Sequence, residues 1–318
     1  MDDDRTHSLD APIPYLLRTR DYYQALGYGA PYEWAHFEQV PFRPLNKALA
    51  DSRVALVTTA APYEAGKGDQ GPGAPYNASA KFYAVYSGDT SKDHDLRISH
   101  VAIDRQHTTA ADPGSYFPLP ELRRMVAAGR IGALTPRFHG APTNRSQRVT
   151  VEVDGPEIVA RCLADGADAA ILVANCPVCH QTLSLVARLL ETHGIATVVM
   201  GCARDIVEWV GVPRLLFSDF PLGNAAGRPG DPASQALTLE LAVGLLEQAQ
   251  GPRTTAVSPL RWSDSDDWKL DYCNIERLKP DEIQRRRAEF DAGKAEALRL
   301  REAAATVRRN AEGDAERL

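Results

Sequence analysis

The chain lacks long hydrophobic runs and any excess of basic residues. No apolar stretch approaches the roughly 18–20 residues that span a bilayer, and residues 1–5 are acidic, unlike the basic start of a signal peptide. The 318 residues carry a formal charge of -6, whereas proteins that bind nucleic acid or an acidic membrane surface usually have an excess of basic residues. We therefore expect a cytoplasmic protein that acts on a small molecule or another protein.

Cysteine is also scarce. The five cysteines are mostly far apart and odd in number, which does not fit the framework of a secreted disulfide protein. In a reducing compartment a close pair is more often catalytic or metal-binding, so Cys176 and Cys179 are the strongest candidates for chemistry. The chain has neither a Gly-rich loop ending in Lys-Ser/Thr nor a strand-linked GxGxxG, so we expect no nucleotide site.

Strand and helix patterns alternate along the second half of the chain. This alternation predicts an α/β fold with a parallel sheet in a Rossmann-like three-layer arrangement, built as two similar α/β halves. The predicted strands cover residues 54–59, 95–103, 169–174, 196–200 and 214–217. The predicted helices cover residues 118–128, 156–164, 177–192, 203–210 and 234–248. Residues 136–148, rich in Pro, Gly and polar side chains, are predicted to form a loop.

Composition divides the chain into four segments. Residues 1–52 form an N-terminal arm rich in aromatics and proline, predicted to pack over a domain or a neighbouring subunit. Residues 53–150 and 151–260 are the first and second α/β halves, and the second carries the cysteine pair. Residues 261–318 are a polar C-terminal tail that we expect to be helical.

The cysteine pair lies where a buried strand gives way to a helix. Cys176 follows the strand, and Cys179 falls in the first helical turn, where free backbone N–H groups and the helix dipole stabilise a thiolate. This placement favours Cys176 as nucleophile and Cys179 as its resolving partner, with His180 orienting or protonating a sulfur. The pattern also fits metal ligation by Cys176, Cys179 and Cys202, or a purely structural pair.

A crevice for the substrate is expected at one edge of the sheet. Ligands of open α/β sheets bind outside the carboxyl ends of the strands, and nearby Arg and Gly-rich loops would hold a substrate carboxylate. The predicted substrate-binding residues are Thr58, Thr59, Arg137, His139, Asp219, Asn224 and Arg228.

Several short stretches resemble a known family. They are Tyr116-Phe117-Pro118-Leu119 with Gly129-Arg130-Ile131-Gly132, Asp168-Ala169-Ala170-Ile171-Leu172 leading to Cys176-Pro177-Val178-Cys179, and Pro221-Leu222-Gly223-Asn224. Their order and spacing, over roughly residues 53–260, resemble the selenoprotein B component of the glycine, sarcosine and betaine reductases and its D-proline reductase counterpart.

The resemblance implies a reaction class. In those enzymes a selenocysteine, followed two intervening residues later by a cysteine, attacks the amino-acid substrate while a pyruvoyl group on a partner subunit activates the amine. Cys176 stands at the selenocysteine position and Cys179 at the following cysteine. The implied protein is an oxidoreductase subunit for a small amino-acid-like substrate, with no cofactor of its own. Its implied partners are other reductase subunits, a thioredoxin-like donor and a second copy of the chain.

The sequence also departs from that family's pattern. Sulfur replaces selenium, and a further cysteine often found downstream has no match around Thr182. Two other functions therefore stay open. One is a metal-dependent lyase or hydrolase with cysteine ligands, including one for a sulfur-containing substrate. The other is a non-catalytic subunit whose aromatic arm and charged tail dock another chain.

Overall fold

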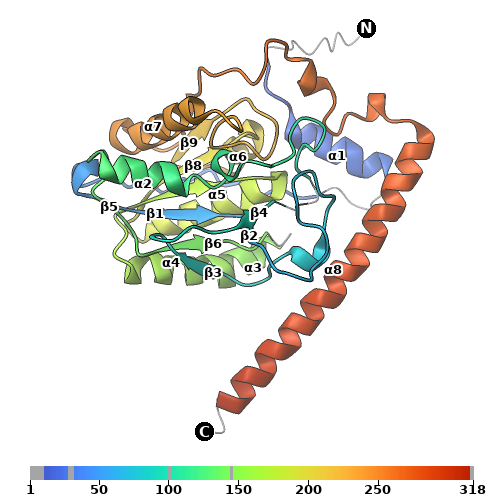
Figure 1. The fold of residues 1–318 in the computed structure, drawn as a ribbon, viewed down its shortest axis with the longest axis horizontal. Helices are drawn as coiled ribbons and strands as arrows, with labels where there is room; N and C mark the ends of the chain where they lie inside the picture. Colours follow the sequence, from blue (N-terminus) through green and yellow to red (C-terminus); the bar gives the residue numbers. More distant parts are fainter. Residues whose placement is uncertain (1–10, 28–31, 99, 101, 144–145, 316–318) are drawn as a thin grey trace.

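A mostly parallel sheet covered by helices on both faces forms the centre of the computed structural model (Figure 1). The structure describes residues 11–27, 32–98, 100, 102–143 and 146–315. This architecture confirms the predicted three-layer α/β fold. Within the described residues, none of the helices combines the length and the apolar character needed to cross a bilayer.

The main sheet has eight strands in the order β10-β9-β8-β7-β1-β6-β3, and β5 pairs with β1. These strands are β1 (Arg53–Thr58), β3 (Tyr86–Asp89), β5 (Ala133–Leu134), β6 (Arg137–Gly140), β7 (Ala169–Val173), β8 (Ala196–Gly201), β9 (Arg214–Phe217) and β10 (Thr254–Val257). Strand β3 runs antiparallel to β6, and the other pairs are parallel. A separate antiparallel pair is formed by β2 (Ala61–Pro62) and β4 (Leu96–Arg97).

Helices pack on the two faces of this sheet (Figure 1). One face carries α3 (Gln147–Val149), α4 (Gly155–Ala164), α5 (Pro177–Thr192) and α6 (Arg204–Val210), and the other carries α2 (Leu119–Ala127) and α7 (Pro232–Gln248). Helix α1 (Tyr15–Ala25) packs against α6. A π-helical turn joins α3 to α4, and short 3-10 turns cover Leu49–Asp51, Ala78–Ala80, Pro113–Ser115, Asp267–Leu270 and Ile275–Arg277.

The sequence predicted β1, β7, β8 and β9 well and the other strands of the first half poorly. Strands β7, β8 and β9 are buried throughout, as apolar runs in a parallel sheet with both faces covered should be. In contrast, residues 95–103 contribute only the two-residue β4 within the described chain, and residues 137–140 form β6 instead of a loop. Strands of both predicted halves join one sheet, and the segment boundaries at residues 53, 151 and 261 stay a prediction.

The N-terminal arm is tied to the sheet by a buried ion pair. The Arg214 guanidinium of β9 lies 2.8 Å from the Glu191 carboxylate of α5, and both side chains are 0% exposed. The arm joins this pair through Arg43, whose backbone N–H donates to Glu191 and whose carbonyl accepts from Arg214 at 2.6 Å. Glu191 also accepts hydrogen bonds from the N–H and hydroxyl of Thr197 at 2.6 and 2.9 Å.

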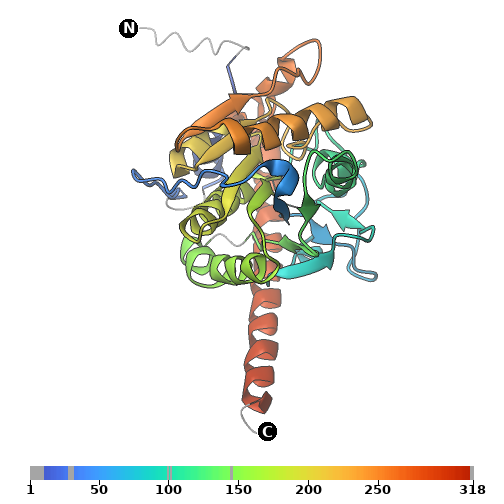
Figure 2. The same cartoon turned by 90° about the vertical axis from the view of Figure 1, so that its left-hand side faces the viewer.

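Helix α8 (Pro280–Ala315) confirms the expected helical tail (Figures 1 and 2). Its first part contacts the body, where Arg287 donates to the Leu26 carbonyl at the end of α1 and the helix packs on the turn at Ala78–Ala80. The second part projects beyond the body in both views. The first part of α8 therefore covers the end of α1 and the turn at Ala78–Ala80.

Replacing Glu191 with alanine tests the buried pair. The change leaves Arg214 buried without its counter-charge, so we expect the free energy of unfolding to fall by about 3–5 kcal/mol, measured by urea denaturation. Glu152→Ala is the matched control because its carboxylate pairs with Arg148 on the surface, and we expect a change within about 0.5 kcal/mol. Equal losses in the two variants would contradict this role for the pair.

Candidate functional site

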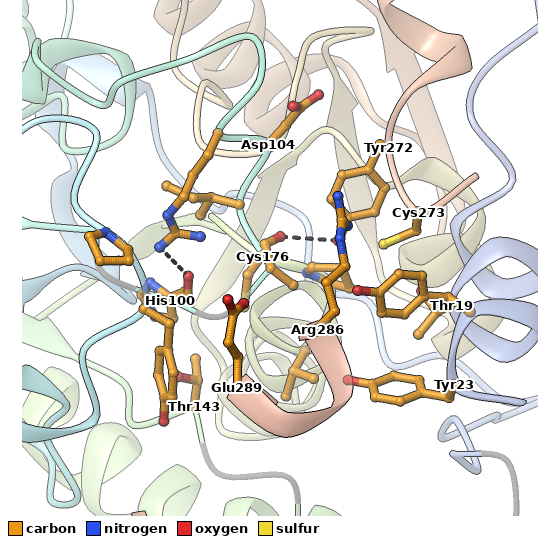
Figure 3. Close-up of a pocket in the computed structure, with 18 of the residues that line it drawn as sticks. Thr19, Tyr23, His100, Asp104, Thr143, Cys176, Tyr272, Cys273, Arg286 and Glu289 are labelled. Atoms are coloured by element: carbon orange, nitrogen blue, oxygen red, sulfur yellow. Dashed lines mark hydrogen bonds between the residues drawn. The ribbon is translucent and has the colours of Figure 1, made fainter. Parts of the chain in front are cut away.

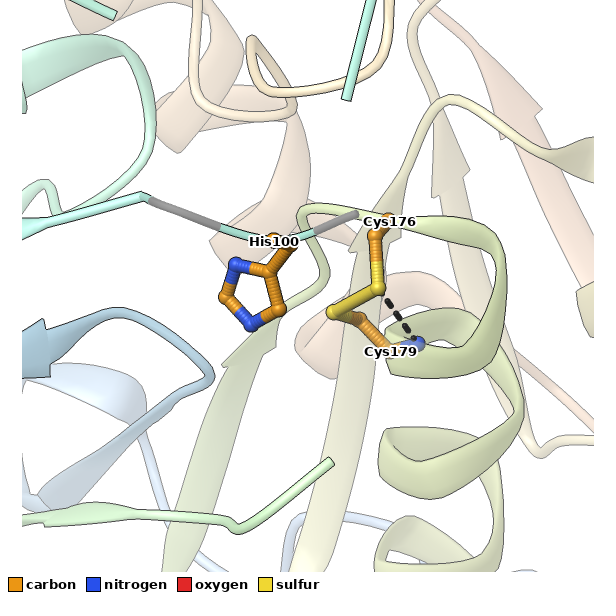
Figure 4. A group of neighbouring side chains, drawn as sticks. All are labelled: His100, Cys176 and Cys179. Carbon is orange, nitrogen blue, oxygen red and sulfur yellow. Dashed lines mark hydrogen bonds between the residues drawn. A yellow bond between two sulfur atoms is a disulfide. The ribbon is translucent and has the colours of Figure 1, made fainter. Parts of the chain in front are cut away.

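The cysteine pair begins α5 directly after β7, as predicted. Cys176 is the residue that caps the helix, and its Sγ accepts a hydrogen bond from the backbone N–H of Cys179 at 3.2 Å. The two cysteines are joined as a disulfide with a Cα–Cα separation of 4.9 Å (Figure 4). A sulfur thus occupies the position where a serine, threonine or aspartate oxygen usually satisfies a free N–H of a helix, which also suits a thiolate after reduction.

The two sulfurs differ in access. Cys176 is 5% exposed and lines a pocket, whereas Cys179 is 0% exposed behind it. A molecule in the pocket therefore meets Cys176 first.

His180 has a different place from the one predicted. Its Nε2 accepts the backbone N–H groups of Cys202 at 2.9 Å and Ala203 at 3.1 Å, so Nδ1 carries the proton and donates to the Cys176 carbonyl at 2.7 Å. Burial lowers the pKa of His180 to about 4. The expectation that His180 orients or protonates a sulfur stays a prediction, and in the structure both ring nitrogens bind backbone groups, one of them the carbonyl of Cys176. A Cβ added at Gly201 would lie 2.6 Å from this ring.

A cavity of about 560 Å³ opens in front of Cys176 (Figure 3). Segments far apart in the sequence build its wall: α1, residues 75–82, residues 100 and 102–106, the start of α5, residues 272–273 and the first part of α8. Seven aromatic side chains contribute to the lining: Tyr22, Tyr23, Tyr32, Trp34, Tyr76, Phe82 and Tyr272. Burial raises the pKa of Cys273, a second thiol in this wall, to about 12, so it stays protonated.

Positive charge predominates around the cavity. The cations are Lys81, Arg105, Arg285, Arg286 and Lys294, against the two carboxylates of Asp104 and Glu289. Some of this charge is shared with nearby acids: Arg286 Nε donates to Glu282 at 2.9 Å, and Arg285 lies 3.9 Å from Glu289. Five cations against two carboxylates give a formal excess of three, so the cavity favours an anionic ligand.

The sequence grouped His100 with neighbouring polar residues that could serve acid/base work or form a solvated face, but it did not place His100 beside the cysteine pair. A ring nitrogen of His100 and the Sγ atoms of Cys176 and Cys179 all lie within 4.8 Å of one another (Figure 4). Burial, together with the charges of Lys81 and Arg105, lowers the pKa of His100 to about 3, so the ring is neutral. The only clue in the sequence was the polar stretch around residues 93–107, which has no tight motif.

The polar residues at the ends of the strands do meet, but they bind one another. Asn175 Nδ2 donates to Thr59 Oγ1 at 3.1 Å, which joins the ends of β1 and β7. The Thr58 hydroxyl accepts the N–H of Ala60 at 3.1 Å. Asn224 donates to the Pro221 carbonyl at 3.0 Å. Thr58, Thr59 and Asn224 are 0% exposed, and none is among the described residues that line the pocket.

The predicted charged residues also lie away from the pocket lining. Asp219 pairs with the buried Lys269 at 2.5 Å, and Arg228 pairs with Asp231 at 2.7 Å. Arg137 begins β6, at the end of the strand opposite the carboxyl edge, and pairs with Asp165 at 2.7 Å. The substrate-binding role expected for these residues stays a prediction, and in the structure each of them has a neighbour of opposite charge.

His139 is buried inside the protein. It is 0% exposed, its Nδ1 lies 2.9 Å from the Ser87 hydroxyl, and its Nε2 lies 3.4 Å from the Asp165 carboxylate. Burial lowers the pKa of His139 to about 4, with Arg137 and Arg161 acting in the same direction against the raising effect of Asp165. The predicted contact of His139 with substrate stays a prediction, and His139 is outside the described lining of the pocket.

Cys202 does not join the pair in a ligand cluster. In the part of the chain that the structure describes, the group of three or more potential ligands within reach of one another is His100, Cys176 and Cys179. Burial raises the pKa of the Cys202 thiol to about 12, which disfavours the thiolate that a metal needs. Among the described residues, the third potential ligand beside the pair is His100, whereas the sequence suggested Cys202.

Comparison with known proteins points to one family. A family model for glycine/sarcosine/betaine reductase selenoprotein B matches residues 24–175, ending directly before Cys176. The chain is 32% identical over 196 residues to the D-proline reductase subunit gamma of Acetoanaerobium sticklandii, covering 60% of this chain and 77% of that protein. No solved structure matches the chain.

Two relatives with lower identity to the chain are named as subunits of a glycine reductase complex. The chain is 27% identical over 224 residues to the glycine reductase complex component B subunit gamma of Carboxydothermus hydrogenoformans, covering 70% of this chain. It is 25% identical over 211 residues to the protein of that name in Symbiobacterium thermophilum, covering 64% of this chain. The alignments span 50% and 48% of those two relatives, about half of their length.

The buried His139 predicts how stability depends on pH. Its pKa is about 4 in the folded chain and 6.5 when unperturbed, so the unfolded chain binds the proton more tightly between these values. Lowering the pH from 6.5 to 4 should remove about 2–3 kcal/mol of stability through this residue. In urea denaturation at several pH values, His139→Gln should lose less stability over this range, while His193→Gln, at the exposed end of α5, should follow wild type. If stability fell equally with pH in wild type, His139→Gln and His193→Gln, the role of His139 in this pH dependence would be contradicted.

Proposed function

Because the chain belongs to the glycine/sarcosine/betaine reductase selenoprotein B family, we propose that it is an oxidoreductase subunit of a reductase complex. In this proposal Cys176 attacks a small amino-acid-like substrate and Cys179 resolves the product. The main support for this proposal is the different access of the two cysteines. Cys176 caps α5 and lines a cationic pocket, whereas Cys179 is buried within one helical turn of Cys176.

The proposed reaction is a two-electron reduction of the substrate. The Cys176 thiolate attacks the carbon that bears the amine, so that a C–S bond forms and the C–N bond breaks, and the amine leaves with its electron pair and takes a proton. The Cys179 thiolate then attacks the Cys176 sulfur. An S–S bond forms, the C–S pair passes to carbon, and carbon takes a proton. Two electrons from a thioredoxin-like dithiol restore the pair.

The pocket fits the substrate class. Its volume of about 560 Å³ and its excess of cations suit a small molecule with a carboxylate, and its aromatic walls suit the apolar part of an amino acid. D-proline and glycine appear in the names of the relatives and are the first substrates to try. Lys81, Arg105 and Lys294 take the carboxylate-binding role in this proposal.

The proposed partners follow from the same reaction. Other subunits of a reductase complex would contribute to the site, and a pyruvoyl group on one of them would make the amine a better leaving group. This chain would contribute the thiol pair and the anion pocket and would carry no cofactor for the C–N cleavage. A second copy of the chain is a further proposed partner, and the cytoplasm is the proposed compartment.

Single replacements of the two cysteines test the unequal roles. One equivalent of iodoacetamide on the reduced chain should label Cys176 ahead of Cys179, because Cys176 lines the pocket, and peptide mass spectrometry identifies the labelled residue. In the assembled complex with D-proline, Cys176→Ser should lower turnover by at least about 10³-fold, a typical loss for a nucleophile. Cys179→Ser should keep the first attack and accumulate a substrate adduct on Cys176.

Cys202→Ser is the matched control for these variants, because Cys202 is also buried and lies just before α6, outside the pocket lining. It should retain turnover near that of wild type. Full turnover in both Cys176→Ser and Cys179→Ser would instead make this chain a docking subunit without thiol chemistry, and the proposal would fall.

The charge of the pocket can be measured without knowing the substrate. Iodoacetate is anionic and iodoacetamide is neutral, so the ratio of their alkylation rates at Cys176 reports the local potential. Lys294→Glu should lower this ratio about three- to tenfold at low ionic strength, and added salt should shrink the effect. Lys92→Glu is the control, because Lys92 is exposed and outside the pocket lining. Equal ratios in the two variants would remove the proposed anion site.

A further inference from the structure

His100 stands beside the cysteine pair without a task in the proposed reaction. Its ring nitrogen and both sulfur atoms lie within 4.8 Å of one another, and the three side chains come from two distant segments of the chain (Figure 4). The His100 ring hydrogen-bonds the backbone of Thr59, and its Nδ1 is buried without a hydrogen-bond partner among the described residues. The ring is therefore held in place next to the two sulfur atoms.

These three donors match a known class of metal site. Two thiolates and one neutral imidazole bind Zn²⁺ at distances of about 2.3 Å and 2.0–2.1 Å, and a site with three protein ligands leaves one position open. Donors around such an ion are separated by about 3.5 Å, so the three atoms are already close enough to surround one. The open position would face the cavity, because both Cys176 and His100 line it.

The oxidation state of the pair decides whether these donors are available. In the disulfide each sulfur uses an electron pair in the S–S bond and carries no negative charge, so only His100 remains as a good ligand. Two-electron reduction by the thioredoxin-like donor yields two thiols, and binding of a divalent ion displaces their protons without any change in the oxidation state of the metal.

We propose that the reduced Cys176–Cys179 pair and His100 form a binding site for a soft divalent cation of the zinc class, and that the disulfide abolishes it. This inference rests on the reversible thiol cycle of the proposed function. Cys176 cannot serve as a ligand and as a nucleophile at the same time, so the bound ion holds the reduced pair in a resting state. Cys202 takes no part in this ligand set.

Metal titration of the full chain tests the site without any activity measurement. The reduced protein, kept anaerobic, is titrated with Co²⁺ as a spectroscopic probe, and Zn²⁺ is then added in competition. We expect one Co²⁺ per chain with sulfur-to-cobalt charge-transfer absorption, displacement by Zn²⁺, and no binding to the oxidised protein. His100→Gln should weaken binding at least about tenfold, and Cys176→Ser should abolish the charge-transfer signal of a two-thiolate site.

Two matched variants complete the experiment. His107→Gln changes another histidine of the same segment, which pairs with Asp104, and Cys202→Ser changes another buried thiol. Both should bind Co²⁺ like wild type, and circular dichroism checks that all variants are folded. Absence of Co²⁺ binding to the reduced wild type, or equal affinity in His100→Gln and wild type, would overturn the proposed site.

The outcomes also separate this inference from the reductase proposal. Metal binding with full turnover in both single cysteine variants would keep the metal site and remove the thiol mechanism. Loss of turnover in Cys176→Ser, together with a reduced wild type that binds no Co²⁺, would overturn the metal site and keep the mechanism.

Discussion

The His180 imidazole binds backbone groups of two neighbouring strand-to-helix connections. It accepts N–H groups at the start of α6 and donates to the carbonyl of Cys176 at the start of α5. Because both ring nitrogens are used, the starts of the two helices cannot shift independently, and the position of Cys176 is fixed relative to the sheet. Gly201 leaves the space for this ring. The neutral form is required, since a protonated ring could not accept the two N–H groups.

The sequence predicts the second half of the fold because its signals are local. The strands at β7, β8 and β9 are continuous apolar runs, α5 begins at Pro177, and Gly194 and Gly211 follow the ends of α5 and α6. The location of Cys176 and Cys179 at a strand-to-helix junction follows from the same local pattern. Strand β6 was missed because Arg137–Gly140 has no apolar run of its own and is buried only through its pairing with β1 and β3.

The environment of the pair could not be predicted in the same way. His100 and the cations of α8 reach Cys176 from segments about 75 and 110 residues away, and no spacing rule connects them. The carboxyl-edge rule placed Thr59 correctly beside Asn175. It could not show that Asp219, Arg137 and Arg228 each have a neighbour of opposite charge. A charge that is already paired is a weak candidate for binding substrate, and this pairing is visible only in three dimensions.

Cys176 has a sulfur atom at the position where the resemblance expects selenium, so the proposed chemistry depends on how well the protein stabilises the Cys176 thiolate. A thiol is less acidic than a selenol, so the thiolate needs more support, and here the free N–H groups of α5 and the excess of cations in the pocket supply it. The same thiolate, beside a neutral His100, is also a good ligand for a soft cation. Attack on substrate, metal binding and disulfide formation all draw on the same electron pairs, so they exclude one another. In the proposed scheme the disulfide makes Cys176 unavailable both for attack and for metal binding, and within the reduced pair a bound cation excludes attack.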